Sequence, residues 1–160
     1  MEITAVDLTW KEGANIIVGQ SHFIKTVEDL AEIMVTSVPG VRYGLAFCEA
    51  SGDCLIRTAG NDDGLVKDVV RCAEAVGAGH SFYLVIQNAF PINVLNQIKA
   101  CQEVTHVFCA TANPLQVIVV ETDQGRGIVA VVDGFAPKGV EGREDQQARK
   151  ALMRKLGYKA

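Results

Sequence analysis

A short polar loop carries the side chains best suited to bind an anion. The loop at residues 19–26 follows an apolar run and places His22 and Lys25 just before a helix signal at Thr26. Thr26 and Asp29 have the spacing of a capping box. The first backbone N–H groups of a helix lack partners within it, and the helix dipole favours negative charge there. The sequence therefore predicts a phosphate-compatible loop.

A second group of polar residues marks the ends of two β-branched runs. The runs are residues 117–122 and 128–132, and the loop between them has the Gly content of a hairpin turn. Because both runs are apolar at nearly every position, we expect a central hairpin buried on both faces, in the middle of a sheet covered by helices. Polar residues at the ends of these strands should lie at the rim of the core: Asn113, Glu121, Arg126 and Asp133.

These residues also have ordinary structural interpretations. His22 and His80 follow loops at element boundaries, where a side chain can do chemistry or only satisfy backbone groups. Glu121 can simply end a strand, and Asp133 can belong only to a turn. From the residues alone, both interpretations stand. The G-x-G-x-x-A match at residues 125–130 runs into a strand instead of opening a helix, so we reject a dinucleotide site there.

The elements that must position these residues are seven or eight strands and four helices in mixed order. Besides the hairpin, the pattern predicts strands at residues 3–8, 14–18, 42–48, 55–59, 81–86 and 105–110. It predicts helices at residues 26–38, from about 62 to 76, from 91 onward, and at 143–156. This order predicts an α/β domain, with α+β as the alternative, in which helices pack on a mixed sheet.

Composition limits the classes of function. A chain of 160 residues with 49% hydrophobic and 21% charged residues fits one globular domain over residues 1–160. A net charge of −4 without a basic block argues against nucleic acid, and the apolar runs are too short to cross a membrane. No export or transit signal is visible, so a cytoplasmic location is expected. The five cysteines include no C-x-x-C, which predicts reduced core thiols and no metal site.

Several segments together resemble the adenosine-specific kinase family. They are Gly-Gln-Ser-His-Phe-Ile-Lys-Thr-Val-Glu-Asp-Leu at residues 19–30, Gly-His-Ser-Phe at 79–82, Pro-Ile-Asn-Val-Leu at 91–95, Cys-Ala-Thr-Ala-Asn-Pro at 109–114, Glu-Thr-Asp-Gln-Gly-Arg-Gly-Ile at 121–128 and Val-Asp-Gly at 132–134. The resemblance covers nearly the whole chain. It implies a small, oligomeric α/β protein that binds adenosine or AMP and can hold a stably phosphorylated histidine.

The resemblance also implies catalytic roles. His22 would accept a phosphoryl group on one neutral ring nitrogen while a hydrogen bond holds the other, although His80 stays open as the carrier. Lys25, backbone N–H groups and Arg126 would neutralise the transferred group. Asp133 would orient or deprotonate the nucleoside 5′-hydroxyl. The phosphoryl donor is not identified, with ATP and Mg²⁺ as one option, and no tightly bound cofactor is predicted.

An adenine ring needs a flat apolar contact and a donor–acceptor pair. Phe82 or Phe23 would supply the flat contact, and Asn113 the polar pair. The full set of expected substrate-binding residues is Gln20, His80, Phe82, Asn113, Glu121 and Arg126.

Three functions compete at this stage. The first is a phosphotransferase that acts on adenosine or AMP through a phosphorylated histidine. The second is a non-catalytic adenosine- or AMP-binding protein that carries a stable phosphohistidine, and the third is an assembly module. In each case a symmetric homo-oligomer is expected, with a trimer favoured and the site near a subunit boundary.

Overall fold

Eight strands and four helices form close to where the hydrophobic pattern predicts them in the computed structural model, which describes residues 1–160. The strands are β1 (Glu2–Leu8), β2 (Asn15–Ser21), β3 (Arg42–Cys48), β4 (Ile56–Gly60), β5 (Ser81–Gln87), β6 (Val104–Thr111), β7 (Leu115–Glu121) and β8 (Arg126–Asp133). The helices are α1 (Thr26–Ser37), α2 (Asp63–Val76), α3 (Pro91–Ala100) and α4 (Arg143–Lys155). The predicted α/β layered class is confirmed.

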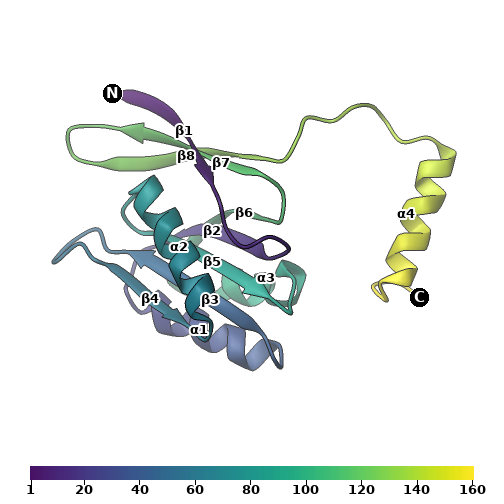
Figure 1. Ribbon diagram of the computed structural model, residues 1–160, viewed down its shortest axis with the longest axis horizontal. Helices are drawn as coiled ribbons and strands as arrows, with labels where there is room; N and C mark the ends of the chain where they lie inside the picture. Colours follow the sequence, from purple (N-terminus) through teal and green to yellow (C-terminus); the bar gives the residue numbers. More distant parts are fainter.

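A five-stranded antiparallel sheet in the order β4-β3-β5-β2-β6 is the middle layer. Helices α1 and α3 cover one face of it (Figure 1). Because side chains alternate along a strand, Ile17 of β2 and Leu84 of β5 point to this face, where Leu30 and Met34 of α1 and Ile98 of α3 meet them. All five side chains are fully buried.

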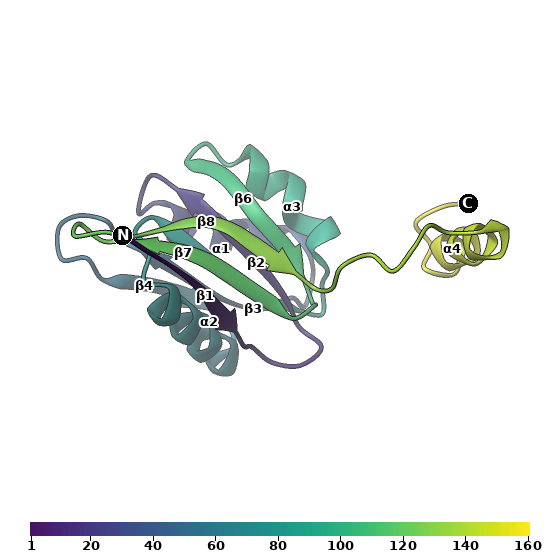
Figure 2. The ribbon, with the colours of Figure 1, turned by 90° about the horizontal axis from the view of Figure 1, so that it is seen from above.

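The other face of the large sheet is covered by α2 and by a second sheet in the order β1-β7-β8 (Figure 2). Leu115, Val117 and Val119 on the inner face of β7 join the core with Val69 of α2. The start of α2 packs closely on β3, since a Cβ atom on Gly44 would lie 2.3 Å from the Leu65 carbonyl carbon. Glycine is required at this point of contact.

The β7–β8 hairpin forms as predicted, but the expectation that both strands are buried on both faces is wrong for β8. This strand is at the edge of the small sheet, and Val129 is 60% exposed and Val132 46% exposed. An unbroken apolar run predicts a central strand, but here it forms an edge strand with one exposed face. The single chain provides no layer to cover the outer face of the small sheet.

The chain then leaves the sheets as an arm, residues 135–160, that ends in α4. Figures 1 and 2 both show α4 apart from the rest of the molecule, and none of its residues is buried. Phe135, Val140, Leu152 and Leu156 of the arm are largely exposed. The helix predicted there is confirmed, but its apolar side contacts no sheet. None of the four helices has the length and hydropathy required to cross a lipid bilayer.

Candidate functional site

Backbone hydrogen bonds bring His22 and His80, the two candidate phosphoryl carriers, to one end of the large sheet. The N–H of Ser21, the last residue of β2, donates to the carbonyl of His80 at 3.0 Å, and the N–H of His80 donates to the carbonyl of Cys48 at 2.8 Å. The N–H of His22 donates to the carbonyl of Glu103 at 3.0 Å. The ends of β2 and β3 and the starts of β5 and β6 are therefore tied together around His22 and His80.

The two histidines line a single pocket of about 180 Å³, here called the histidine pocket. The ring of His22 stacks on Phe23, and the ring of His80 stacks on Phe47. His22 is exposed, whereas His80 is half-buried and has a positive φ of 62°. The remaining residues of the histidine pocket are Ile24, Glu49, Ala50 and Ser51.

Unused backbone donors lie beside His22. The N–H groups of Thr26 and Val27 already bond to the carbonyls of Phe23 and Ile24, but those of Phe23, Ile24 and Lys25 make no hydrogen bond within the chain. Consecutive free N–H groups form an anion-binding concavity when they converge. The loop therefore has donors for a phosphate next to an exposed imidazole.

Lys25 lies in this loop, but its ammonium group is engaged elsewhere. It forms an ion pair with Asp29 and lies 4.0 Å from Glu103 Oε1. The hydrogen bond with Asp29 raises the pKa of Lys25 and lowers the pKa of Asp29. The predicted capping box is therefore wrong, because Asp29 bonds to Lys25 and the Thr26 hydroxyl bonds to Ser21 Oγ and the Phe23 carbonyl.

Sequence reasoning missed Glu49, which lines the histidine pocket, and its ion-pair partner Arg57. Glu49 Oε1 lies 2.9 Å from an Arg57 guanidinium nitrogen, and its Oε2 accepts from the N–H of Leu55. That N–H bond, followed by Arg57, lowers the pKa of the Glu49 carboxyl. Glu49 follows β3 directly, just as His22 follows β2. A polar residue at the end of a strand is therefore the sequence signal that could have found it.

The adenine contact predicted for Phe82 needs correction. Its side chain is fully buried, and its ring packs against Gly19 so closely that a Cβ atom there would lie 2.3 Å from the ring. Neither ring face is open to a ligand. The alternative, Phe23, is 49% exposed and lines the histidine pocket.

Gln20 and Arg126 lie near this end of the sheets, in a neighbouring pocket of about 150 Å³. Arg126 Nε donates to Glu121 Oε2 at 2.8 Å, and a guanidinium nitrogen donates to the Ala75 carbonyl at 3.4 Å. Arg126 therefore joins the tip of the β7–β8 hairpin to α2. The ion pair with Glu121 orients the guanidinium of Arg126, and the Arg126 side chain stays partly exposed.

Asp133 and Asn113 form a separate cluster. Asp133 Oδ1 accepts from Thr111 Oγ1 at 2.6 Å and from Asn113 Nδ2 at 3.1 Å. Thr111 pairs with Ile16 at the start of β2, whereas His22 follows the end of β2. Six residues of extended strand span roughly 20 Å, so within one chain this cluster cannot contact a ligand atom bound to His22.

A comparison with protein-family models identifies the family. Residues 6–159 match the family model described as "Adenosine specific kinase". The chain is also similar to the PH1918 protein from Pyrococcus horikoshii OT3, whose crystal structure is 43% identical in sequence and superposes with a TM-score of 0.95 over 99% of this chain and 98% of that one. No curated protein matched the chain. A match over nearly the whole chain shows that this protein belongs to the adenosine-specific kinase family.

Proposed function

We propose that the protein binds adenosine or AMP and transfers a phosphoryl group by way of His22. The observation that carries this proposal is the exposed His22 ring at the histidine pocket, beside the free N–H groups of Phe23, Ile24 and Lys25. An imidazole nucleophile and donors for phosphate oxygens are the two parts that a phosphohistidine requires.

The proposed transfer takes place in two steps. One ring nitrogen of His22 forms a bond to the phosphorus of the donor as the bond to the donor's leaving oxygen breaks. The 5′-oxygen of adenosine then attacks that phosphorus, the phosphorus–nitrogen bond breaks, and the hydroxyl proton passes to the carboxylate of Asp133. Phosphoryl transfer depends chiefly on positioning and electrostatics, which the N–H groups of the loop supply here. Phe23 provides the flat contact for adenine.

We assign different roles to the other residues near His22. His80 is half-buried, stacks on Phe47 and uses its N–H and carbonyl groups to join strand ends, so it shapes the histidine pocket. Lys25 forms an ion pair with Asp29 and so positions the loop against the first turn of α1. Arg126 and Gln20 line the neighbouring pocket and would contact the distal part of the ligand.

We further propose that the complete site forms between two copies in a homo-oligomer, with a trimer favoured. The separation of Asp133 from His22 within one chain supports this arrangement, because the second copy would supply Asp133 and Asn113. The exposed arm and the apolar outer face of the small sheet supply surface for such contacts. The two structures superpose with a TM-score of 0.95 over 99% of this chain. If the arm, residues 135–160, had a different position in the Pyrococcus structure, the score would be lower, so we infer that the arm projects in a similar way there.

Intact-mass measurement of His22→Asn and His80→Asn tests the proposal. After incubation with ATP and Mg²⁺, the wild type and His80→Asn should gain an acid-labile phosphate that added adenosine removes, and His22→Asn should gain none. A phosphate that adenosine does not remove would favour the non-catalytic binding protein. Phosphate retained in His22→Asn and lost in His80→Asn would transfer the role to His80. If the wild type neither gained phosphate nor bound adenosine, the remaining hypothesis would be that the protein is an assembly module.

A further inference from the structure

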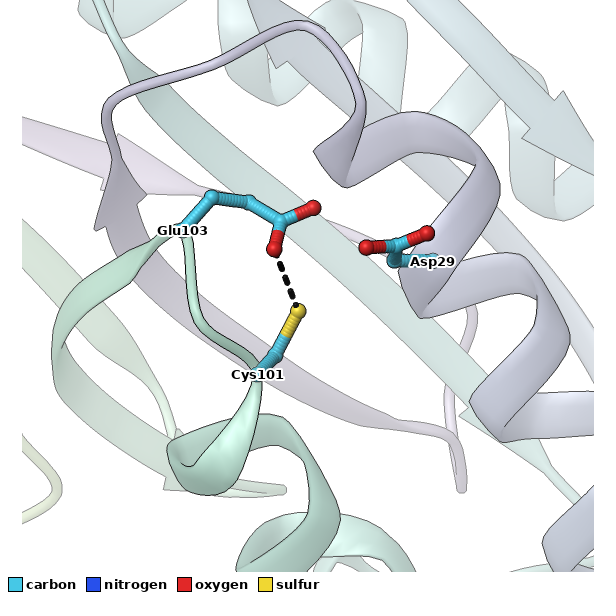
Figure 3. A group of neighbouring side chains, drawn as sticks. All are labelled: Asp29, Cys101 and Glu103. Carbon is cyan, nitrogen blue, oxygen red and sulfur yellow. Dashed lines mark hydrogen bonds between the residues drawn. The ribbon is translucent and has the colours of Figure 1, made fainter.

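Three side chains from separate elements converge next to the histidine loop. Asp29 lies in the first turn of α1, Cys101 follows α3, and Glu103 precedes β6. One ligand atom from each lies within 4.8 Å of the others, and Figure 3 shows the side chains pointing toward one another. In the proposed phosphoryl transfer, none of these three side chains contacts the phosphoryl group or the nucleoside.

The environment of Glu103 indicates that a partner is missing. Its side chain is 1% exposed, and Oε2 accepts a hydrogen bond from Cys101 Sγ at 3.1 Å. Oε1 is buried without any hydrogen-bond partner, and its distance of 4.0 Å from Lys25 Nζ is too long for one. A buried carboxylate oxygen without a partner is costly, so such groups normally bind a cation or donor.

The nearby ammonium group does not fill this gap. Lys25 pairs with Asp29, and its Nζ stays 4.0 Å from Glu103 Oε1. A cation held between Asp29, Cys101 and Glu103 would give the buried Glu103 oxygen the partner that it lacks.

We propose that Asp29, Cys101 and Glu103 bind a divalent transition-metal ion of the zinc type. A thiolate with two carboxylates suits Zn²⁺, whereas Mg²⁺ and Ca²⁺ prefer oxygen ligands alone. Asp29 and Cys101 are half-buried, so a water molecule can complete a four-coordinate site. Lys25 remains hydrogen-bonded to Asp29 as an outer partner of the ligand.

The metal would brace the loop that carries His22. The backbone carbonyl of Glu103 accepts a hydrogen bond from the N–H of His22. If the side chain of Glu103 also bound the metal, both its backbone and its side chain would be held in place, and His22 with them. The ligands are at positions 29, 101 and 103, a spacing typical of no metal motif. This explains why the sequence predicted no metal site.

Cobalt is the probe for the thiolate ligand. The full-length chain is freed of metal with a chelator and titrated with Co²⁺, and one equivalent per chain should produce thiolate-to-cobalt charge-transfer absorption that Zn²⁺ abolishes. Each Co²⁺ should also release about one proton, the one lost by Cys101. Cys101→Ser should remove the charge-transfer absorption and weaken Zn²⁺ binding by at least about 100-fold. Cys109→Ser, at another half-buried cysteine, should change neither.

Two results would overturn the proposal. One is the absence of charge-transfer absorption in the wild type at excess Co²⁺, and the other is its persistence in Cys101→Ser. Glu103→Gln is a second test, with a circular dichroism spectrum as the check on folding. Zn²⁺ should raise the Tm of the wild type but not that of Cys101→Ser, because a ligand that binds only the folded state stabilises it. None of these measurements depends on phosphoryl transfer.

Discussion

The N–H of Ser21 donates to the carbonyl of His80 at 3.0 Å, which holds the residue before His22 against the second histidine. The carbonyl that accepts this bond belongs to a residue with a positive φ of 62°. A left-handed backbone is tolerated by Asn and strongly disfavoured for β-branched residues. The conformation of one histidine therefore sets the position of the loop that carries the other.

Two substitutions at His80 separate its backbone role from its ring. His80→Asn and His80→Val both lose the stacking on Phe47, so the difference between them reports the backbone conformation. We expect His80→Val to be less stable than His80→Asn by about 1–3 kcal/mol, the usual cost of a strained backbone. Denaturant unfolding measures this difference. Equal stabilities would show that His80 is free to change its φ.

The pH dependence of stability should contain a contribution from Asp62. Its carboxylate accepts from the N–H of Leu65 at the start of α2 and pairs with Arg42, and these contacts, the N–H first, lower its pKa. Because the folded-state pKa lies below the unfolded value of 3.8, this stabilisation is present above that pH and disappears as the pH falls through the folded value.

Asp62→Asn keeps a capping oxygen but removes the charge. Between about pH 5 and about pH 2, we expect the Tm of this variant to fall less than that of the wild type. Asp53→Asn, in an exposed turn, serves as the control and should follow the wild type. If Asp62→Asn and the wild type lose Tm in parallel, the carboxylate contributes nothing to acid sensitivity.

The sequence predicted the strands and helices better than it predicted which of their faces are buried. The β-branched runs at residues 117–122 and 128–132 correctly predicted a hairpin, but periodicity cannot tell whether a second face is covered by the same chain or by another. Phe82 and Phe23 were equal candidates for adenine because burial depends on the whole fold, and only Phe23 is exposed. Glu103 gave no local signal, since its partners Asp29 and Cys101 meet it only through tertiary packing.

The arm should hold the proposed oligomer together. Leu152 lies in the last turn of α4, Leu156 follows the helix one turn later, and their side chains are 49% and 53% exposed. Replacing both with Asp puts charge into the proposed interface, so light scattering should show a smaller assembly than the wild type, which we expect at three times the chain mass of 17.2 kDa. Lys150→Asp changes the opposite side of the helix and should leave the mass unchanged. A wild-type monomer at micromolar concentration would contradict the proposal.

Mixing two inactive variants tests whether the site is shared between copies. His22→Asn lacks the phosphoryl acceptor, and Asp133→Asn lacks the group that receives the hydroxyl proton, which should slow adenosine-dependent discharge by about 10²- to 10⁴-fold. If each site takes His22 from one chain and Asp133 from its neighbour, random oligomers from an equal mixture should regain roughly one quarter of the wild-type sites. Phosphate transfer to adenosine is the readout, after native mass spectrometry has shown that the chains exchange. A mixture no more active than its separate components would place the site within one chain and would require Asp133 to act far from His22.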